Sequence, residues 1–217
     1  QQAAAGVPAD LLADAVDDEI RLWWEQFISA GWLEQLPARR YAEYTLNAAF
    51  NKFRLTATYD LIAVEPGGKA TILDWKTSQR PPQKSAYRRR VQTRLYCYLL
   101  SLAGSHLNQG QTIDPTHIQM VYWFPNFPQH TLIFDYTQKL LDEDARYFEK
   151  LTTEIQHLSE GQFSLTAEEK RCRFCNYRSL CNRGSNSGNW QDQDEDSSET
   201  GPGALNLDLD QIGEISF

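Results

Sequence analysis

The sequence predicts an α/β fold in which a mixed β-sheet is flanked by helices. After a leading helical segment, the patterns follow the order strand, strand, strand, helix, strand, strand, helix, which is typical of an α/β core. The chain has 217 residues, 41% of them hydrophobic, and is therefore long enough to bury a substantial core. We expect one folded domain over residues 1–184, followed by an acidic and largely disordered tail over 185–217.

The leading helix is predicted over residues 9–29, where apolar residues recur at helical spacing after a proline. Three strands are then expected, and the second and third join through the Pro-Gly-Gly turn at 66–68. A long helix follows at 85–103, because its apolar residues form a helical stripe. The five predicted strands cover 41–50, 52–64, 70–77, 117–124 and 130–136, and a last helix is predicted over 137–160.

The β-hairpin predicted over residues 59–76 brings acidic side chains together. The three-residue loop at 66–68 has a length suited to a type I turn closed by a left-handed glycine. In that register the numbers of opposed residues sum to 134, so Asp60 faces Asp74 with Cβ atoms roughly 5 Å apart. A bulge at the turn would slip the register by one residue and separate the two carboxylates.

The hairpin also places Lys76 on the same face as Asp74, because side chains two apart on a strand share a face. Two adjacent carboxylates repel each other unless a cation lies between them, and Mg²⁺ prefers such oxygen ligands. A neighbouring lysine can orient or deprotonate an attacking water and stabilise the transition state of phosphodiester hydrolysis. The pattern therefore predicts a Mg²⁺ or Mn²⁺ site that cuts phosphodiesters; the alternative is an ordinary surface hairpin with acidic residues at its edge.

The helix at 85–103 carries Gln92 and Tyr96, four residues apart beside the apolar stripe. The series formed by Asp60, the segment I-L-D-W-K-T-S at 72–78 and Q-T-R-L-Y at 92–96 resembles the PD-(D/E)XK nuclease superfamily, in particular its RecB-like branch. The resemblance implies the restriction-endonuclease-like α/β core of that superfamily.

The resemblance also implies a set of site residues. The two aspartates and the backbone carbonyl of Trp75 would ligate the metal, and the lysine would act on the water. The glutamine and tyrosine would contact the DNA backbone and brace the lysine; the alternative for these two is a helix flank that packs on the sheet. The implied residues are Asp60, Asp74, Trp75, Lys76, Gln92 and Tyr96.

Three cysteines near the end of the predicted domain form a second motif. Cys172, Cys175 and Cys181 follow a CxxC spacing with a third cysteine five residues later, and thiols so close in sequence are usually metal ligands. The triplet resembles that of RecB-like nucleases related to AddB-type and CRISPR-associated enzymes, which implies a [4Fe-4S] cluster. Zinc and a disulfide are the alternatives. The fourth cysteine, Cys97, lies in an apolar helical setting, so we expect that the fourth cluster ligand and an active-site histidine belong to a missing N-terminal part of the domain.

The distribution of charge favours DNA as the partner. The net charge is −8, but the segment from Asn186 onward holds eight acidic residues and no lysine or arginine, so the rest of the chain is neutral. Basic residues gather around the cysteines and beside the Q-x-x-x-Y motif, where they can neutralise phosphates. The expected DNA-binding residues are Arg88, Arg89, Arg90 and Arg94; a solvated helix face is the alternative.

These observations predict a metal-dependent DNA nuclease, an exonuclease in DNA repair, recombination or CRISPR adaptation. The alternative is a catalytically inactive DNA-binding or scaffold subunit of a helicase-nuclease complex. The apolar end of the tail could dock on such a helicase or on another nuclease-complex subunit. No apolar run approaches the roughly 18 residues of a membrane helix, and no secretory signal is visible, so we expect a cytoplasmic protein.

Overall fold

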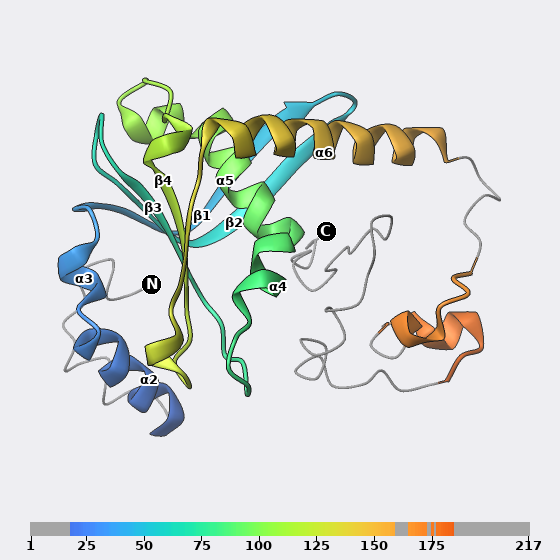
Figure 1. Ribbon diagram of the computed structural model, residues 1–217, viewed down its shortest axis with the longest axis horizontal. Coiled ribbons are helices and arrows are strands. Elements are labelled where there is room, and N and C mark those ends of the chain that lie inside the picture. Colours follow the sequence, from blue (N-terminus) through green and yellow to red (C-terminus); the bar gives the residue numbers. More distant parts are fainter. Residues whose placement is uncertain (1–17, 159–164, 173–174, 176, 185–217) are drawn as a thin grey trace. The chain divides into compact units, whose positions relative to one another are not determined.

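The computed structural model describes residues 18–158, 165–172, 175 and 177–184 (Figure 1). The start of the predicted leading helix, the end of the predicted last helix and the whole acidic tail lie outside these residues. The chain divides into two compact units, and the division falls between Glu149 and Lys150. The sheet and the predicted hairpin motif belong to the first unit, whereas the three late cysteines belong to the second.

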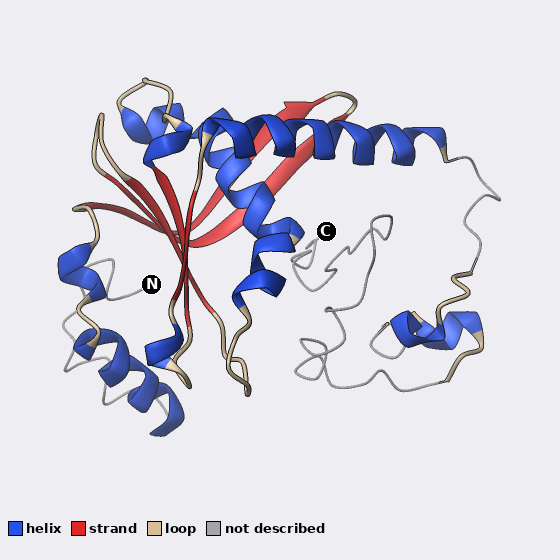
Figure 2. Ribbon diagram, in the orientation of Figure 1, coloured by secondary structure: helices blue, strands red, loops and turns tan. Residues whose placement is uncertain are grey.

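The first unit is built on a five-stranded mixed sheet, shown in red in Figure 2. The strands follow the order β1-β2-β3-β4-β5, and all neighbours are antiparallel except β3 and β4, which are parallel. The predicted α/β fold with a mixed sheet is therefore confirmed. The strands are β1 (Arg39–Phe50), β2 (Phe53–Val64), β3 (Ala70–Trp75), β4 (Ile118–Trp123) and β5 (Leu132–Asp135).

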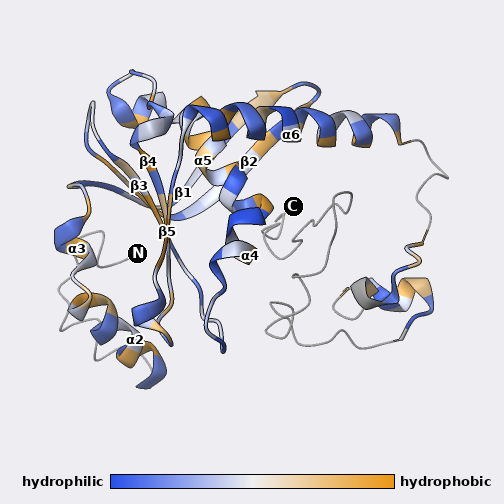
Figure 3. Cartoon of the chain, in the orientation of Figure 1, coloured by the Kyte–Doolittle hydropathy of each residue, from blue (hydrophilic) through white to orange (hydrophobic). Residues whose placement is uncertain are grey.

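Helices cover both faces of this sheet (Figure 1). The helices α2 (Asp18–Ser29) and α3 (Trp32–Gln35) bury apolar side chains against one face, where Phe27 contacts the ring of Trp123. The helices α4 (Lys84–Arg89) and α5 (Val91–Ala103) lie on the other face and form the crossover between β3 and β4. The last helix, α6 (Gln138–His157), follows β5 and is largely hydrophilic along its length (Figure 3).

The crossover differs from the single helix that the sequence predicts. The chain breaks at Arg90, whose φ of −61° and ψ of 139° are extended rather than helical. The carbonyl of Tyr87 accepts hydrogen bonds from the Arg90 N–H at 3.2 Å and from the Thr93 hydroxyl at 2.6 Å. These two donors replace the helical hydrogen bonding of a continuous helix, so α5 starts in a new direction one residue before Gln92.

The hairpin register is confirmed, but its turn differs from the expected type. The pairs Leu61–Leu73 and Val64–Ala70 both sum to 134. The Gly68 N–H donates to the Glu65 carbonyl at 2.8 Å, and the positive φ of 72° falls on Gly67, the third residue of the turn. A proline at the second position with a positive φ at the third is the type II pattern, not type I. The register survives because both turns close the same three-residue loop.

An ion pair joins α5 to α6 inside the first unit. The Arg94 Nε donates to Asp144 Oδ1 at 2.5 Å, and the Tyr136 hydroxyl donates to Asp144 Oδ2 at 2.9 Å. Asp144 is only 3% exposed, so its charge depends on these donors. In the part of the chain that the structure describes, no helix is long and apolar enough to cross a membrane.

Candidate active site

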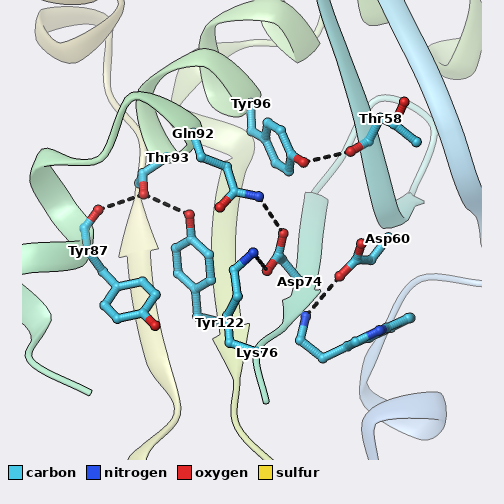
Figure 4. A network of polar contacts seen from close by, with 10 residues as sticks. Thr58, Asp60, Asp74, Lys76, Tyr87, Gln92, Thr93, Tyr96 and Tyr122 are labelled. Atoms are coloured by element: carbon cyan, nitrogen blue, oxygen red, sulfur yellow. Dashed lines mark hydrogen bonds and ion pairs between the residues drawn. The ribbon is translucent and has the colours of Figure 1, made fainter. Parts of the chain in front are cut away.

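Three elements bring the predicted motif residues together on the α5 side of the sheet (Figure 4). Asp74 lies near the end of β3 and is 1% exposed. Its Oδ2 lies 3.0 Å from the Lys76 ammonium, and its Oδ1 accepts a 2.8 Å hydrogen bond from the Gln92 amide on α5. The aspartate, the lysine and the glutamine of the motif therefore converge on one carboxylate.

Asp60 lies at the point where the β2–β3 ladder ends, one residue beyond the Leu61–Leu73 pair. Its Oδ2 accepts a hydrogen bond from the Trp75 N–H at 3.1 Å. Burial and then the charge of Asp74 raise the pKa of Asp60 from 3.8 to about 7, against the Trp75 hydrogen bond and the charge of Lys76. Asp60 and Asp74 thus lie close enough for each charge to disfavour the other.

The pKa of Asp74, which is more buried than Asp60, is also raised. Burial raises its pKa, and the charge of Lys76, the charge of Arg90 and the Gln92 hydrogen bond oppose that rise. The pKa values of both carboxylates stay raised despite these positive charges, and a divalent cation between the two would offset their repulsion.

The donor set fits a hard divalent ion. The Oδ2 of Asp74 is paired with Lys76 at 3.0 Å, whereas the buried Gln92 Oε1 lacks a hydrogen-bond partner among the described residues. A buried oxygen without a partner is a group that a cation or its bound water would satisfy. Within the described ranges, no group of three or more His, Cys, Asp or Glu side chains is arranged to hold a metal. Two carboxylates suit Mg²⁺, which commonly binds through one or two carboxylates and keeps several waters.

Comparison with known protein families gives the same superfamily as the sequence motifs. The family model of the PD-(D/E)XK nuclease superfamily matches residues 2–182. The chain belongs to the PD-(D/E)XK nuclease superfamily. Its members are generally metal-dependent nucleases.

Other comparisons add little to this assignment. No match to this PD-(D/E)XK protein was found among the curated proteins. One solved structure, described as "Crystal structure of SSO0001", is similar to this chain at 14% sequence identity and a TM-score of 0.42. The match covers 81% of this chain and 71% of the other chain.

Gln92 and Tyr96 of the PD-(D/E)XK site are both buried and brace the carboxylate side of the site rather than the lysine. Gln92 donates to Asp74, as described above, and the Tyr96 hydroxyl donates to the Thr58 carbonyl at 2.6 Å. In return, the Tyr59 hydroxyl donates to the Tyr96 carbonyl at 2.9 Å. These reciprocal bonds tie α5 to β2 immediately before Asp60.

The four predicted arginines lie in different surroundings. Arg94 pairs with Asp144 and stacks over the Tyr147 ring at 3.8 Å, so its guanidinium serves the packing of α5 on α6. The Arg90 guanidinium stacks over the Tyr87 ring, also at 3.8 Å, and its charge acts on Asp74.

Arg88 and Arg89 lie on α4 and are exposed, and the Arg88 guanidinium lies 5.6 Å from the centroid of the Phe134 ring. Of the four, Arg90 is therefore the arginine whose charge acts on a site carboxylate, that of Asp74.

Sequence reasoning missed Tyr122, which lies beneath the lysine of the nuclease motif. Tyr122 pairs with Asp74 in the parallel β3–β4 ladder, and its hydroxyl shares a 2.8 Å hydrogen bond with the Thr93 hydroxyl. The Lys76 ammonium lies 6.0 Å from the centroid of the Tyr122 ring. The missing signal was the register of β3 against β4, which no local pattern encodes.

The Trp75 side chain is half-buried. Its ring packs edge-on against Phe27 at 6.2 Å, on the face covered by α2. The side chain therefore belongs to the core on that face, and its backbone is the part directed toward Asp60.

The three late cysteines are half-buried, and no disulfide joins them among the described residues. Arg183 Nη1 donates to Cys172 Sγ at 3.0 Å, and Cys97 is a buried core thiol. As with the carboxylates, no set of three such ligands among the described positions is arranged around one metal. A cluster would require the three thiols to draw together.

Proposed function

We propose that this protein is a divalent-metal-dependent DNA nuclease that hydrolyses phosphodiester bonds. The observation that carries the proposal is the half-buried Asp60 beside the buried Asp74, with the Lys76 ammonium 3.0 Å from Asp74, in a member of this superfamily. Two adjacent carboxylates whose pKa values stay raised beside Lys76 and Arg90 are poorly suited to a purely structural role, because their charges destabilise the fold.

Each motif residue has a defined task in this proposal. Asp60, Asp74 and the Trp75 carbonyl would hold Mg²⁺ or Mn²⁺, which supplies an activated water and stabilises negative charge. Lys76 would orient the attacking water and stabilise the charge that develops on the phosphate. Gln92 holds the Asp74 carboxylate in place through its 2.8 Å hydrogen bond.

The proposed substrate is DNA, held by Arg88, Arg89 and Arg90 beside the site. Arginine binds phosphate oxygens through several fixed donors, and stacking on Tyr87 orients the Arg90 guanidinium. Arg94 is proposed to act through its ion pair with Asp144 rather than through phosphate. We further propose exonuclease action in DNA repair, recombination or CRISPR adaptation, with a helicase or nuclease-complex subunit as the protein partner.

A catalytically inactive DNA-binding or scaffold subunit is the second candidate. It is favoured by the fact that the residues described by the structure gather two carboxylates at the site and no third His, Cys, Asp or Glu side chain. Such a protein would bind DNA through the same arginines and would show no metal-dependent cleavage.

The test is cleavage of end-labelled linear DNA with Mg²⁺ or Mn²⁺. Asp74→Asn and Lys76→Met approximately keep the size and shape of the side chains they replace, and each should abolish cleavage while leaving DNA binding. The matched controls are Asp142→Asn and Lys69→Met at exposed positions, which should cleave as the wild type does. DNA binding without cleavage by the wild type would favour the inactive subunit, and neither binding nor cleavage would refute both.

We also propose that Cys172, Cys175 and Cys181 take part in an iron-sulfur cluster. Support comes from their CxxC spacing with a third cysteine five residues later. Anaerobically purified protein should show absorbance near 400 nm that Cys172→Ser removes. Tightly bound zinc in a colourless, iron-free protein would overturn the iron-sulfur assignment.

A further inference from the structure

Glu43 has an unusual backbone conformation in the middle of β1. Its φ is +49°, in the left-handed region that residues other than glycine rarely adopt. The other described non-glycine residues with positive φ are Asn51 in the β1–β2 turn and Gln109 and Asn182 at the ends of short helices. Turns and helix ends commonly contain such residues, whereas the interior of a strand does not.

The strands β1 and β2 change faces at this point. Tyr41 and Tyr44 both pack into the core beneath α5, and their ring centroids lie 5.4 Å apart. In β2, Tyr59 and Ile62 both belong to this same core. Residues three apart on a regular strand lie on opposite faces, so both strands reverse their alternation between these positions.

The reversal occurs without a slip in register. The pairs Ala42–Leu61 and Tyr44–Tyr59 have the same sum, so no extra residue is inserted as in a β-bulge. The pair that should lie between them, formed by Glu43 and Asp60, is absent from the ladder. Asp60 therefore lies outside the regular strand pairing at the position opposite Glu43, the residue with the left-handed backbone.

The reversal allows two consecutive residues to serve the α5 side. Tyr59 donates its hydroxyl to the Tyr96 carbonyl of α5, and Asp60 lies beside Asp74, as Figure 4 shows. A regular strand that kept Tyr59 beneath α5 would direct Asp60 to the opposite face, away from Asp74.

We propose that Glu43 is a positioning residue, whose left-handed backbone reverses the strand faces so that the Asp60 carboxylate can lie beside Asp74 while Tyr59 stays beneath α5. The inference rests on the proposed function only where it predicts an effect on metal affinity. The placement itself can be followed without metal through the Trp75 N–H, because that group donates to Asp60.

The test compares substitutions that allow or oppose a positive φ. Glu43→Gly retains the conformation, whereas Glu43→Val opposes it because a β-branched residue is strained there. Asn47→Val is the matched control, since Asn47 is exposed on a regular part of the same strand. If Glu43→Val does not fold, Glu43→Asn and Glu43→Ala provide the same comparison, because asparagine tolerates this region.

Two measurements decide the outcome. Glu43→Val should accelerate amide hydrogen exchange of Trp75 in the metal-free protein and weaken Mn²⁺ binding about 10- to 100-fold, the usual effect of losing a group that orients a ligand. Glu43→Gly should keep the wild-type exchange rate at Trp75 and bind Mn²⁺ more tightly than Glu43→Val does, because both variants lack the glutamate charge that acts on Asp60 and differ only in backbone preference. Asn47→Val should match the wild type in both measurements.

Wild-type behaviour of Glu43→Val would overturn the inference. Equal losses in the glycine and valine variants would also overturn it, because they would assign the effect to the glutamate side chain. If the wild type binds no Mn²⁺, the proposed function fails, while the Trp75 exchange rates still decide the role of Glu43.

Discussion

Replacing Asp60 by asparagine should stabilise the metal-free protein at alkaline pH while removing its metal affinity. The substitution keeps the size of the side chain and an oxygen that can accept the Trp75 hydrogen bond. It removes the charge that burial and Asp74 make unfavourable. Asp60→Asn therefore imitates an aspartic acid that is permanently protonated.

The magnitude follows from the pKa of Asp60, which is 3.8 ordinarily and about 7 in the folded protein. Because the folded state binds this proton more tightly, the stabilising contribution of the proton is complete below the unfolded pKa and is lost as pH rises through the folded one. Linkage makes the loss about 4 kcal/mol at pH 8 and about 0.5 kcal/mol at pH 4. Asp60→Asn should recover these amounts.

Urea unfolding of the metal-free wild type and the variant at pH 8 and pH 4 measures the effect. The variant should be more stable at pH 8 and nearly equal to the wild type at pH 4, and added Mg²⁺ should stabilise only the wild type at pH 8. A variant that is less stable than the wild type by the same amount at both pH values would refute the reasoning. Asp142→Asn on the exposed side of α6 is the control and should change neither value.

Three further predictions concern groups around the carboxylates. Gln92→Leu leaves the buried Asp74 Oδ1 without its hydrogen-bond donor. Urea unfolding should show a loss of about 1–3 kcal/mol in the free energy of unfolding, and calorimetry should show a Mn²⁺ affinity about 10- to 100-fold lower. An unchanged affinity would contradict the bracing role. Asp144→Ala removes the carboxylate that joins α6 to α5, and urea unfolding should show a free energy of unfolding lower by about 3 kcal/mol. A change below about 0.5 kcal/mol, the size typical of a surface substitution, would show that the ion pair is unimportant. Arg90→Ala should make the dependence of log DNA affinity on log salt concentration less steep by about 1, as expected for one lost phosphate contact. Arg146→Ala, at an exposed position, should leave that slope unchanged. Equal slopes for both variants would remove Arg90 from the DNA site.

Local patterns in the sequence were sufficient for the parts of the fold that depend on short-range geometry. The hairpin register could be predicted because the Pro-Gly-Gly loop at 66–68 fixes which residues oppose each other, even though the turn proved to be type II. The order of strands and helices followed from hydrophobic periodicity. The approach of Asp60 to Asp74 was a consequence of these two features.

Other parts of the site depend on contacts that the sequence does not display. The helix breaks at Arg90 because Thr93 and Arg90 supply donors to the Tyr87 carbonyl, which is a matter of three-dimensional packing. The left-handed backbone of Glu43 was equally hidden, because glutamate carries no preference for that conformation. Gln92 was expected beside the lysine, and its actual contact with Asp74 depends on how α5 is tilted by that break.

The central claim, that Asp60 and Asp74 together bind a divalent metal, can be tested by the protons released when Mn²⁺ binds. A carboxyl with a pKa of about 7 is mostly protonated at pH 6.5 and must lose that proton to become a ligand. Calorimetric titration in buffers of different ionisation enthalpy should show about 0.8 proton released per Mn²⁺ at pH 6.5 and almost none at pH 8.5. Release should disappear together with binding in Asp60→Asn. Equal proton release at the two pH values, or undiminished Mn²⁺ binding in that variant, would contradict the account.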